Sequence, residues 1–358
     1  MSNMPVDEVI DPHMHLFNLK STPRPMQPLG KLFGWNERVL RFMAKKLMPN
    51  DTVAFFGDGT DLLGDYMPGD YRADAAPSNV NRYVHVQAGW TDKSPLDPVG
   101  ETTWLESLDD GPAAIVGHAD LNLGDGVAAV LAAHKSVSNR VRGIRHTLSW
   151  HESGSIMNFT ERAEMSRTPQ FRAGFDQLAE HELSFDAWCY SGQLAEVEEL
   201  AAYNPDVPMV LCHAGTPVGI GGDFGGVGVS GQERARIGQE WSDSMSSLAT
   251  QQHVFVKLSG FLMPVLGHGY ERSRKRPGVN ELVDKLSPLI EHCIDAFGPQ
   301  RCMFASNFPV DRVSASFGTV AEATVEMTAR YGPDAQQAMF ADTAASFYRI
   351  GGLAPNRV

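Results

Sequence analysis

The chain has 358 residues, with 30 Lys and Arg against 43 Asp and Glu, so its formal net charge is −13. This acidic balance argues against nucleic acid and anionic membrane surfaces as partners, because clustered Lys and Arg hold those ligands. Apolar residues make up 42% and charged residues 20%, the balance of a folded globular protein with a sizeable core.

Short apolar or β-branched runs alternate along the chain with helix-like stretches, which is the pattern of buried parallel strands joined by helices. In chain order, we expect strands at 6–13, 82–88, 113–121, 141–146, 183–188, 208–213, 253–260 and 301–306. Helices with apolar residues at three and four spacing are expected at 193–203, 279–297 and 319–331. Eight such strands predict a closed α/β (TIM) barrel, a single domain over 1–358 whose active site lies at the C-terminal strand ends.

Two connections between the expected strands are too long for plain loops. The first, 18–81, holds an apolar and basic helix candidate at 32–48 and an acidic, glycine-rich stretch at 56–71. We expect it to form an inserted lid, or a subdomain beside the barrel or against a second copy. The second, 214–232, is rich in glycine and is expected to be a mobile cover over the site.

Three histidines stand where strands are expected to end. His13 and His15 close the first strand in the run Asp11-Pro-His-Met-His, and alternate residues of a strand point to the same side. His213 ends the sixth strand in PMVLCHAGTP. We therefore expect three imidazoles to meet at the top of the barrel, where they can act catalytically or hold one divalent ion such as Zn²⁺.

Several motifs, taken together, carry a family resemblance. The HxH strand, the HAG of 213–215, the KLSG of 257–260, the SNFPVD of 306–311 and the ADTAASFYRI of 341–350 resemble the amidohydrolase-2 branch of the amidohydrolase superfamily. The resemblance runs from residue 9 to about 350 and is greatest to the lactonase-like group of pyrone-dicarboxylate and sugar lactonases. It implies the same barrel and a hydrolytic reaction.

The chain departs from the metal-binding pattern of that family. Binuclear members carry a carboxylated Lys at the end of the fourth strand, where this chain reads RGIRH at 142–146. Mononuclear members bind zinc with a fifth-strand His and an eighth-strand Asp, which correspond here to the run around Asp186 and to Asn307. The resemblance to pyrone-dicarboxylate lactonases implies metal-free chemistry, so we expect no cofactor. The alternative is one divalent ion on the three histidines.

The remaining polar residues at the strand ends are candidates for the substrate and the base. Arg145 can hold a substrate carboxylate with two hydrogen bonds. Asn307 cannot act as a base, which leaves Asp311, four residues beyond the strand end, with Asp186 as its rival. Lys257 is expected to form an ion pair inside the barrel. The other residues that we expect at the substrate are Gln87, His146, Trp188, Asp186 and Asn307.

These observations predict a hydrolase that opens a lactone of a small carboxylated or aromatic-derived metabolite, with water attacking a ring carbonyl polarised by the histidines. Two alternatives stay open at this point. One is a metal-dependent non-oxidative decarboxylase or C–C hydrolase, which would need a strong Lewis acid. The other is a barrel that binds a small ligand without turnover. A small molecule is the expected partner, and pairing with a second copy is left open.

The cysteines and the N-terminal residues indicate the cellular compartment of the protein. The four cysteines are widely spread without CxxC spacing, so we expect no disulfide framework and no zinc knuckle. The first twelve residues lack the basic and apolar regions of a signal peptide, and no apolar run is as long as a membrane span. We expect a cytoplasmic protein.

Overall fold

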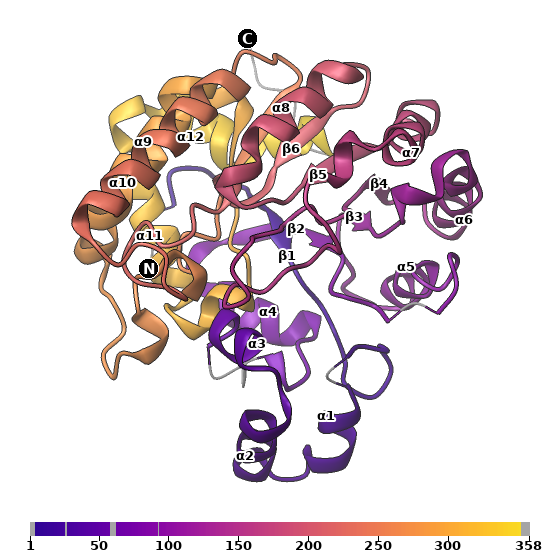
Figure 1. Cartoon of the computed structure of the whole chain (residues 1–358), viewed down its shortest axis with the longest axis horizontal. Helices are drawn as coiled ribbons and strands as arrows, with labels where there is room; N and C mark the ends of the chain where they lie inside the picture. Colours follow the sequence, from indigo (N-terminus) through magenta and orange to yellow (C-terminus); the bar gives the residue numbers. More distant parts are fainter. Residues whose placement is uncertain (1–3, 26, 58–61, 92, 352–358) are drawn as a thin grey trace.

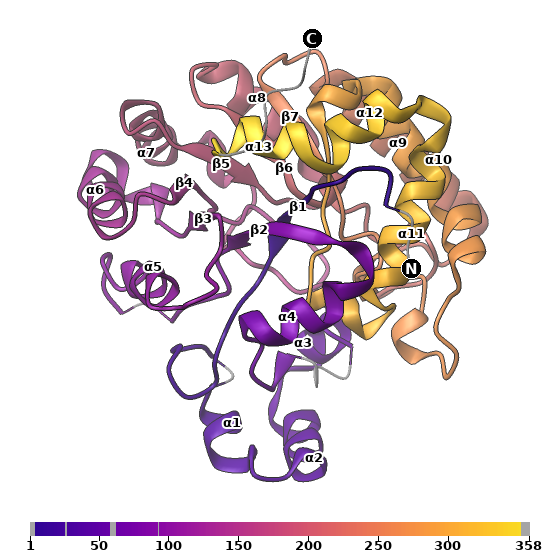
Figure 2. The ribbon, with the colours of Figure 1, turned by 180° about the vertical axis from the view of Figure 1, so that it is seen from behind.

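The computed structural model describes residues 4–25, 27–57, 62–91 and 93–351, and its centre is a parallel β-barrel (Figures 1 and 2). The eight strands are hydrogen-bonded in sequence order from β1 to β8. The barrel closes where the His15 N–H donates to the Phe308 carbonyl and the Asn307 N–H to the His13 carbonyl, each at 2.9 Å. The predicted TIM barrel is confirmed. Its strands are β1 (Val9–Met14), β2 (Val80–Val86), β3 (Ala114–Gly117), β4 (Val141–Ile144), β5 (Ser184–Ala187), β6 (Met209–Leu211), β7 (Val254–Leu258) and β8 (Cys302–Phe304).

All strands except β1 end earlier than the sequence pattern predicts. β6 ends at Leu211 and β8 at Phe304, so His213 and Asn307 lie beyond the regular strands. Both residues have a left-handed backbone, with φ of 55° and 59°. The chain therefore turns sharply at both points, and their side-chain directions do not follow from strand alternation.

Helices surround the barrel (Figure 1). The expected helices at 193–203 and 279–297 are α8 and α10, and the one at 319–331 begins earlier as α11, because Ser316 caps it by accepting from the Thr319 N–H. None of the helices in the described ranges is long and apolar enough to cross a membrane. Those that follow β2 are α5 (Val99–Glu106), α6 (Ala128–Val137), α7 (Pro169–Glu180), α8 (Leu194–Tyr203), α9 (Gly231–Leu248), α10 (Val279–Phe297), α11 (Phe317–Thr328), α12 (Pro333–Gln337) and α13 (Thr343–Phe347).

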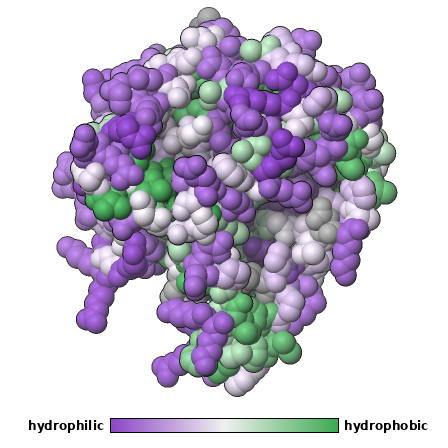
Figure 3. Space-filling view, in the orientation of Figure 1, coloured by the Kyte–Doolittle hydropathy of each residue, from purple (hydrophilic) through white to green (hydrophobic). Residues whose placement is uncertain are grey.

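The connection between β1 and β2 contains α1 (Gln27–Phe33), α2 (Glu37–Leu47), α3 (Asn50–Phe55) and α4 (Pro68–Ala75). The prediction of a single helix over 32–48 is wrong. The Asn36 side chain accepts from two backbone N–H groups and so caps a new helix, α2. Part of the acidic stretch, 58–61, lies outside the described residues. α1 and α2 project from the barrel, and apolar side chains gather over this projection (Figure 3).

Candidate active site

Three imidazoles lie together at the C-terminal end of the barrel. The ring centroid of His13 is 5.0 Å from that of His15 and 4.4 Å from that of His213. His13 belongs to β1, His15 follows it directly, and His213 follows β6. All three side chains are buried. The structure thus gathers the histidines that the sequence singles out.

Hydrogen bonds orient two of these rings. His15 Nδ1 donates to the Val86 carbonyl at 2.7 Å, since a carbonyl can only accept, and this leaves a lone pair on His15 Nε2. His213 Nδ1 lies 2.9 Å from the Ser259 hydroxyl. Burial, followed by nearby cationic groups, lowers the pKa of all three histidines well below its ordinary range. The cluster therefore consists of neutral imidazoles.

Arg145, just beyond β4, reaches into this cluster. One terminal nitrogen lies 3.4 Å from His13 Nε2, and the other donates to the Gln87 carbonyl at 2.6 Å. Its guanidinium lies 5.6 Å from the centroid of the Trp188 ring. Arg145 Nε is buried and has no hydrogen-bond partner among the residues that the structure describes. A buried donor without a partner is costly, so this guanidinium is suited to receive an acceptor from a ligand.

Below the cluster lies a fully buried ion pair between Lys257 and Asp186. The ammonium is 2.5 Å from the carboxylate and 3.4 Å from His13 Nδ1. The Tyr348 hydroxyl donates to the same carboxylate at 2.9 Å. The predicted ion pair of Lys257 is confirmed, and the Asp186 carboxylate is occupied by it. Tyr348 and Ser259 were not predicted, because no local pattern links them to the strand ends that they contact.

Asp311 is buried beside the segment that packs on the His213 ring. Its carboxylate accepts from the Asn307 side-chain amide at 3.0 Å and from the backbone N–H groups of Gly260 and Leu262. Gly260 packs so closely on the His213 ring that an added Cβ would come within 2.5 Å of it. Asp311 therefore holds the segment that supports His213. Burial raises the pKa of Asp311 to about 7.

We expect this carboxyl to make the unfolding free energy depend on pH. Its pKa is higher in the folded than in the unfolded chain, where it is 3.8, so its contribution to stability is present in acid and is lost as the pH rises from about 4 to 7. The difference corresponds to at most about 4 kcal/mol. Urea unfolding across this range should show a shallower decline for Asp311→Asn than for the native chain. The exposed Asp206→Asn is the control, and equal slopes for all three proteins would contradict the expectation.

The other residues expected at the substrate divide into two groups. Trp188 lies near the cluster, its ring centroid 6.0 Å from that of His213, and α3 brings Phe55 to 6.2 Å from Trp188. Gln87 and Asn307 are buried next to the imidazole cluster. The Gln87 carbonyl accepts from Arg145, and the Asn307 N–H donates to the His13 carbonyl. His146 instead accepts from the Leu121 N–H and packs on Phe171 of α7, so its contacts lie outside the barrel.

One set of buried side chains could hold a metal ion. His13, Asp186 and Cys212 each offer a ligand atom, and these atoms lie within 4.8 Å of one another. The set differs from the three histidines expected for a metal, of which it includes only His13. Burial raises the pKa of the Cys212 thiol to about 12, so this group is protonated at neutral pH.

A barrel with buried imidazoles at the C-terminal ends of its strands is the architecture of amidohydrolase-type enzymes. The chain belongs to the amidohydrolase-2 family, whose model matches residues 10–350. The family resemblance read from the motifs is therefore confirmed.

Two curated relatives match most of the chain. Uncharacterized protein y4mH of Sinorhizobium fredii is 33% identical over 345 residues, which is 96% of this chain and 98% of the relative. An L-fucono-1,5-lactonase of Burkholderia ambifaria is 27% identical over 296 residues, 81% of this chain and 87% of the relative.

Solved structures share the fold. An amidohydrolase from Burkholderia multivorans with bound zinc has a TM-score of 0.68 and 22% identity, covering 95% of this chain and 99% of its own. A putative 2-pyrone-4,6-dicarboxylic acid hydrolase from Pseudomonas putida has a TM-score of 0.60 and 17% identity, covering 96% and 98%. At these identities, the likeness establishes the architecture.

Proposed function

We propose that this protein is a lactonase that hydrolyses a cyclic ester bearing a carboxylate, without a metal ion. The observation that carries the proposal is Arg145, a buried guanidinium with an unpartnered Nε that lies against the buried imidazole cluster at His13. A guanidinium holds a carboxylate in a planar, two-bonded arrangement. The similarity to a relative named L-fucono-1,5-lactonase supports ring-opening hydrolysis as the reaction.

Each residue near the imidazole cluster has its own role in the proposed reaction. The lone pair on His15 Nε2 takes a proton from water as the water oxygen bonds to the ring carbonyl carbon. Lys257 supplies positive charge near the oxygen that becomes negative in the tetrahedral intermediate, while Arg145 holds the substrate carboxylate. The carbonyl then re-forms, the ring C–O bond breaks, and the proton passes to the leaving oxygen. Asp311 positions the segment behind His213 in this proposal rather than serving as the base.

The residues present do not fit the zinc that the family pattern implies. The position between His13 and Asp186 already contains the Lys257 ammonium, and Arg145 lies against the other nitrogen of His13. Two cations at this distance repel a divalent ion. The residue that corresponds to the carboxylate ligand is Asn307, whose amide donates to Asp311. No step of the proposed reaction therefore passes through a metal.

A substrate panel tests the reaction class. Purified protein is assayed by acid release against five- and six-membered lactones, with and without a carboxylate, and by carbon dioxide release from aromatic carboxylic acids. We expect hydrolysis to favour carboxylated lactones, and His15→Gln to lower kcat by at least about 100-fold. Carbon dioxide release without lactone opening would contradict the proposal in favour of a decarboxylase, and binding without turnover in favour of a non-catalytic barrel.

A further inference from the structure

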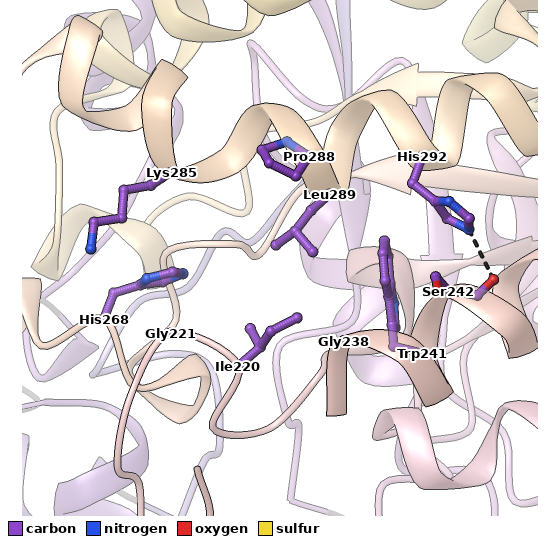
Figure 4. Close-up of a pocket in the computed structure, with 10 residues that line it drawn as sticks. All are labelled: Ile220, Gly221, Gly238, Trp241, Ser242, His268, Lys285, Pro288, Leu289 and His292. Atoms are coloured by element: carbon purple, nitrogen blue, oxygen red, sulfur yellow. Dashed lines mark hydrogen bonds between the residues drawn. The ribbon is translucent and has the colours of Figure 1, made fainter. Parts of the chain in front are cut away.

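A cavity of about 420 Å³ lies outside the barrel, between α9 and α10 (Figure 4). Trp241 and Leu289 contribute apolar walls from the two helices, and Ile220 adds another from the glycine-rich segment 214–232. The loop after β7 contributes His268, and α10 contributes Lys285. None of these residues belongs to the imidazole cluster. The volume is sufficient for a small organic molecule.

One end of the cavity is polar. Both ring nitrogens of His268 are buried without a hydrogen-bond partner among the described residues. The ring packs against Gly221, where an added Cβ would come within 2.3 Å of Nδ1. The Lys285 ammonium lies on the same side of the cavity as His268 (Figure 4). An unpartnered imidazole beside an ammonium offers one hydrogen-bond donor and one positive charge to a bound group.

The opposite walls have a different chemistry. The flat Trp241 ring and the branched side chains of Leu289 and Ile220 face the interior of the cavity (Figure 4). His292 and Ser242 also lie on this side, and His292 Nε2 already donates to the Ser242 carbonyl at 2.9 Å. Aromatic and aliphatic walls favour an apolar body, whereas the polar end favours an anion. From this arrangement, we propose that the cavity is a second binding site, for a small amphipathic carboxylate whose apolar part lies against Trp241.

This site adjoins the chain segment that follows His213. Trp241 Nε1 donates to the Ala214 carbonyl at 2.8 Å, and Ala214 is the residue after His213. Ile220 and Gly221 belong to the same glycine-rich segment, which is also bonded to the loop after β7 through the Gly221 N–H and the Leu266 carbonyl at 2.8 Å. An occupant of the cavity therefore contacts the segment that directly follows one of the three imidazoles.

Isothermal titration of the full chain with 3-phenylpropionate tests the site, with 3-phenylpropanamide as the uncharged comparison. We expect the acid to bind, and the amide to bind at least about tenfold more weakly. Lys285→Gln should weaken binding of the acid by a similar factor. Leu289→Trp, which fills the cavity, should abolish binding, and its fold is checked by thermal unfolding. The exposed Lys93→Gln is the matched control and should bind as the native chain does.

The barrel also contains a cation, so the titration is repeated with Arg145→Gln. Binding that survives this change but is weakened by Lys285→Gln supports the second site. Binding that is lost with Arg145→Gln and kept with Lys285→Gln assigns the ligand to the barrel and overturns the proposal. Equal affinity for acid and amide, or no binding of the acid up to about 10 mM, also overturns it.

Discussion

Replacing Arg145 with Gln will lower kcat/KM for carboxylated lactones by about 100-fold or more, mostly through a higher KM. The guanidinium is buried, and loss of one partner from a buried, charged hydrogen-bonded pair costs about 2–5 kcal/mol. Each 1.4 kcal/mol is about a factor of ten. Lactones without a carboxylate should lose much less. Steady-state kinetics on both kinds of substrate measure the difference.

Arg142 provides a matched control for this change. It lies in β4, three residues before Arg145, but its guanidinium donates to the backbone carbonyls of Asn139 and Val141 rather than into the cluster. Arg142→Gln should leave kcat/KM within about twofold of the native value. Equal losses for the two variants, or an equal loss on uncharged lactones, would contradict the role assigned to Arg145.

Lys257→Met will destabilise the fold by about 3–5 kcal/mol, because it leaves the Asp186 carboxylate buried without its cation. The double variant Lys257→Met with Asp186→Leu should recover a large part of the loss, since it removes both charges. Urea unfolding of the two variants and the native chain measures this.

An exposed ion pair provides the control for the stability loss expected of Lys257→Met. Lys135 lies 3.9 Å from Glu182 at the surface, and Lys135→Met should cost less than about 1 kcal/mol. If Lys257→Met unfolds at the same urea concentration as the native chain, or if the double variant is less stable than Lys257→Met, the account of the buried pair is wrong.

The order of strands was predictable because each is a short apolar run between turn residues. The meeting of His13 with His15 was predictable from strand alternation, which also places Arg145 inward. The same alternation directs His146 away from Arg145, and in the structure it contacts Leu121 and Phe171 of α7.

Other features depend on contacts that no local pattern contains. Tyr348 contacts Asp186 across 162 residues, and Ser259 contacts His213 across 46. The place of Asp311 depends on the left-handed turn at Asn307, after which its carboxyl accepts from Asn307 and from the backbone N–H groups of Gly260 and Leu262. The cavity between α9 and α10 arises only when distant helices pack together.

Lactone hydrolysis and metal content, measured in the same samples, distinguish metal-free from metal-dependent catalysis. Protein purified without added metal is analysed for zinc, iron and manganese, treated with a chelator, and assayed before and after. For metal-free catalysis, we expect an unchanged rate per mole of protein at metal contents far below one ion per chain. Loss of hydrolysis on chelation, restored in proportion to bound zinc or manganese, would contradict it.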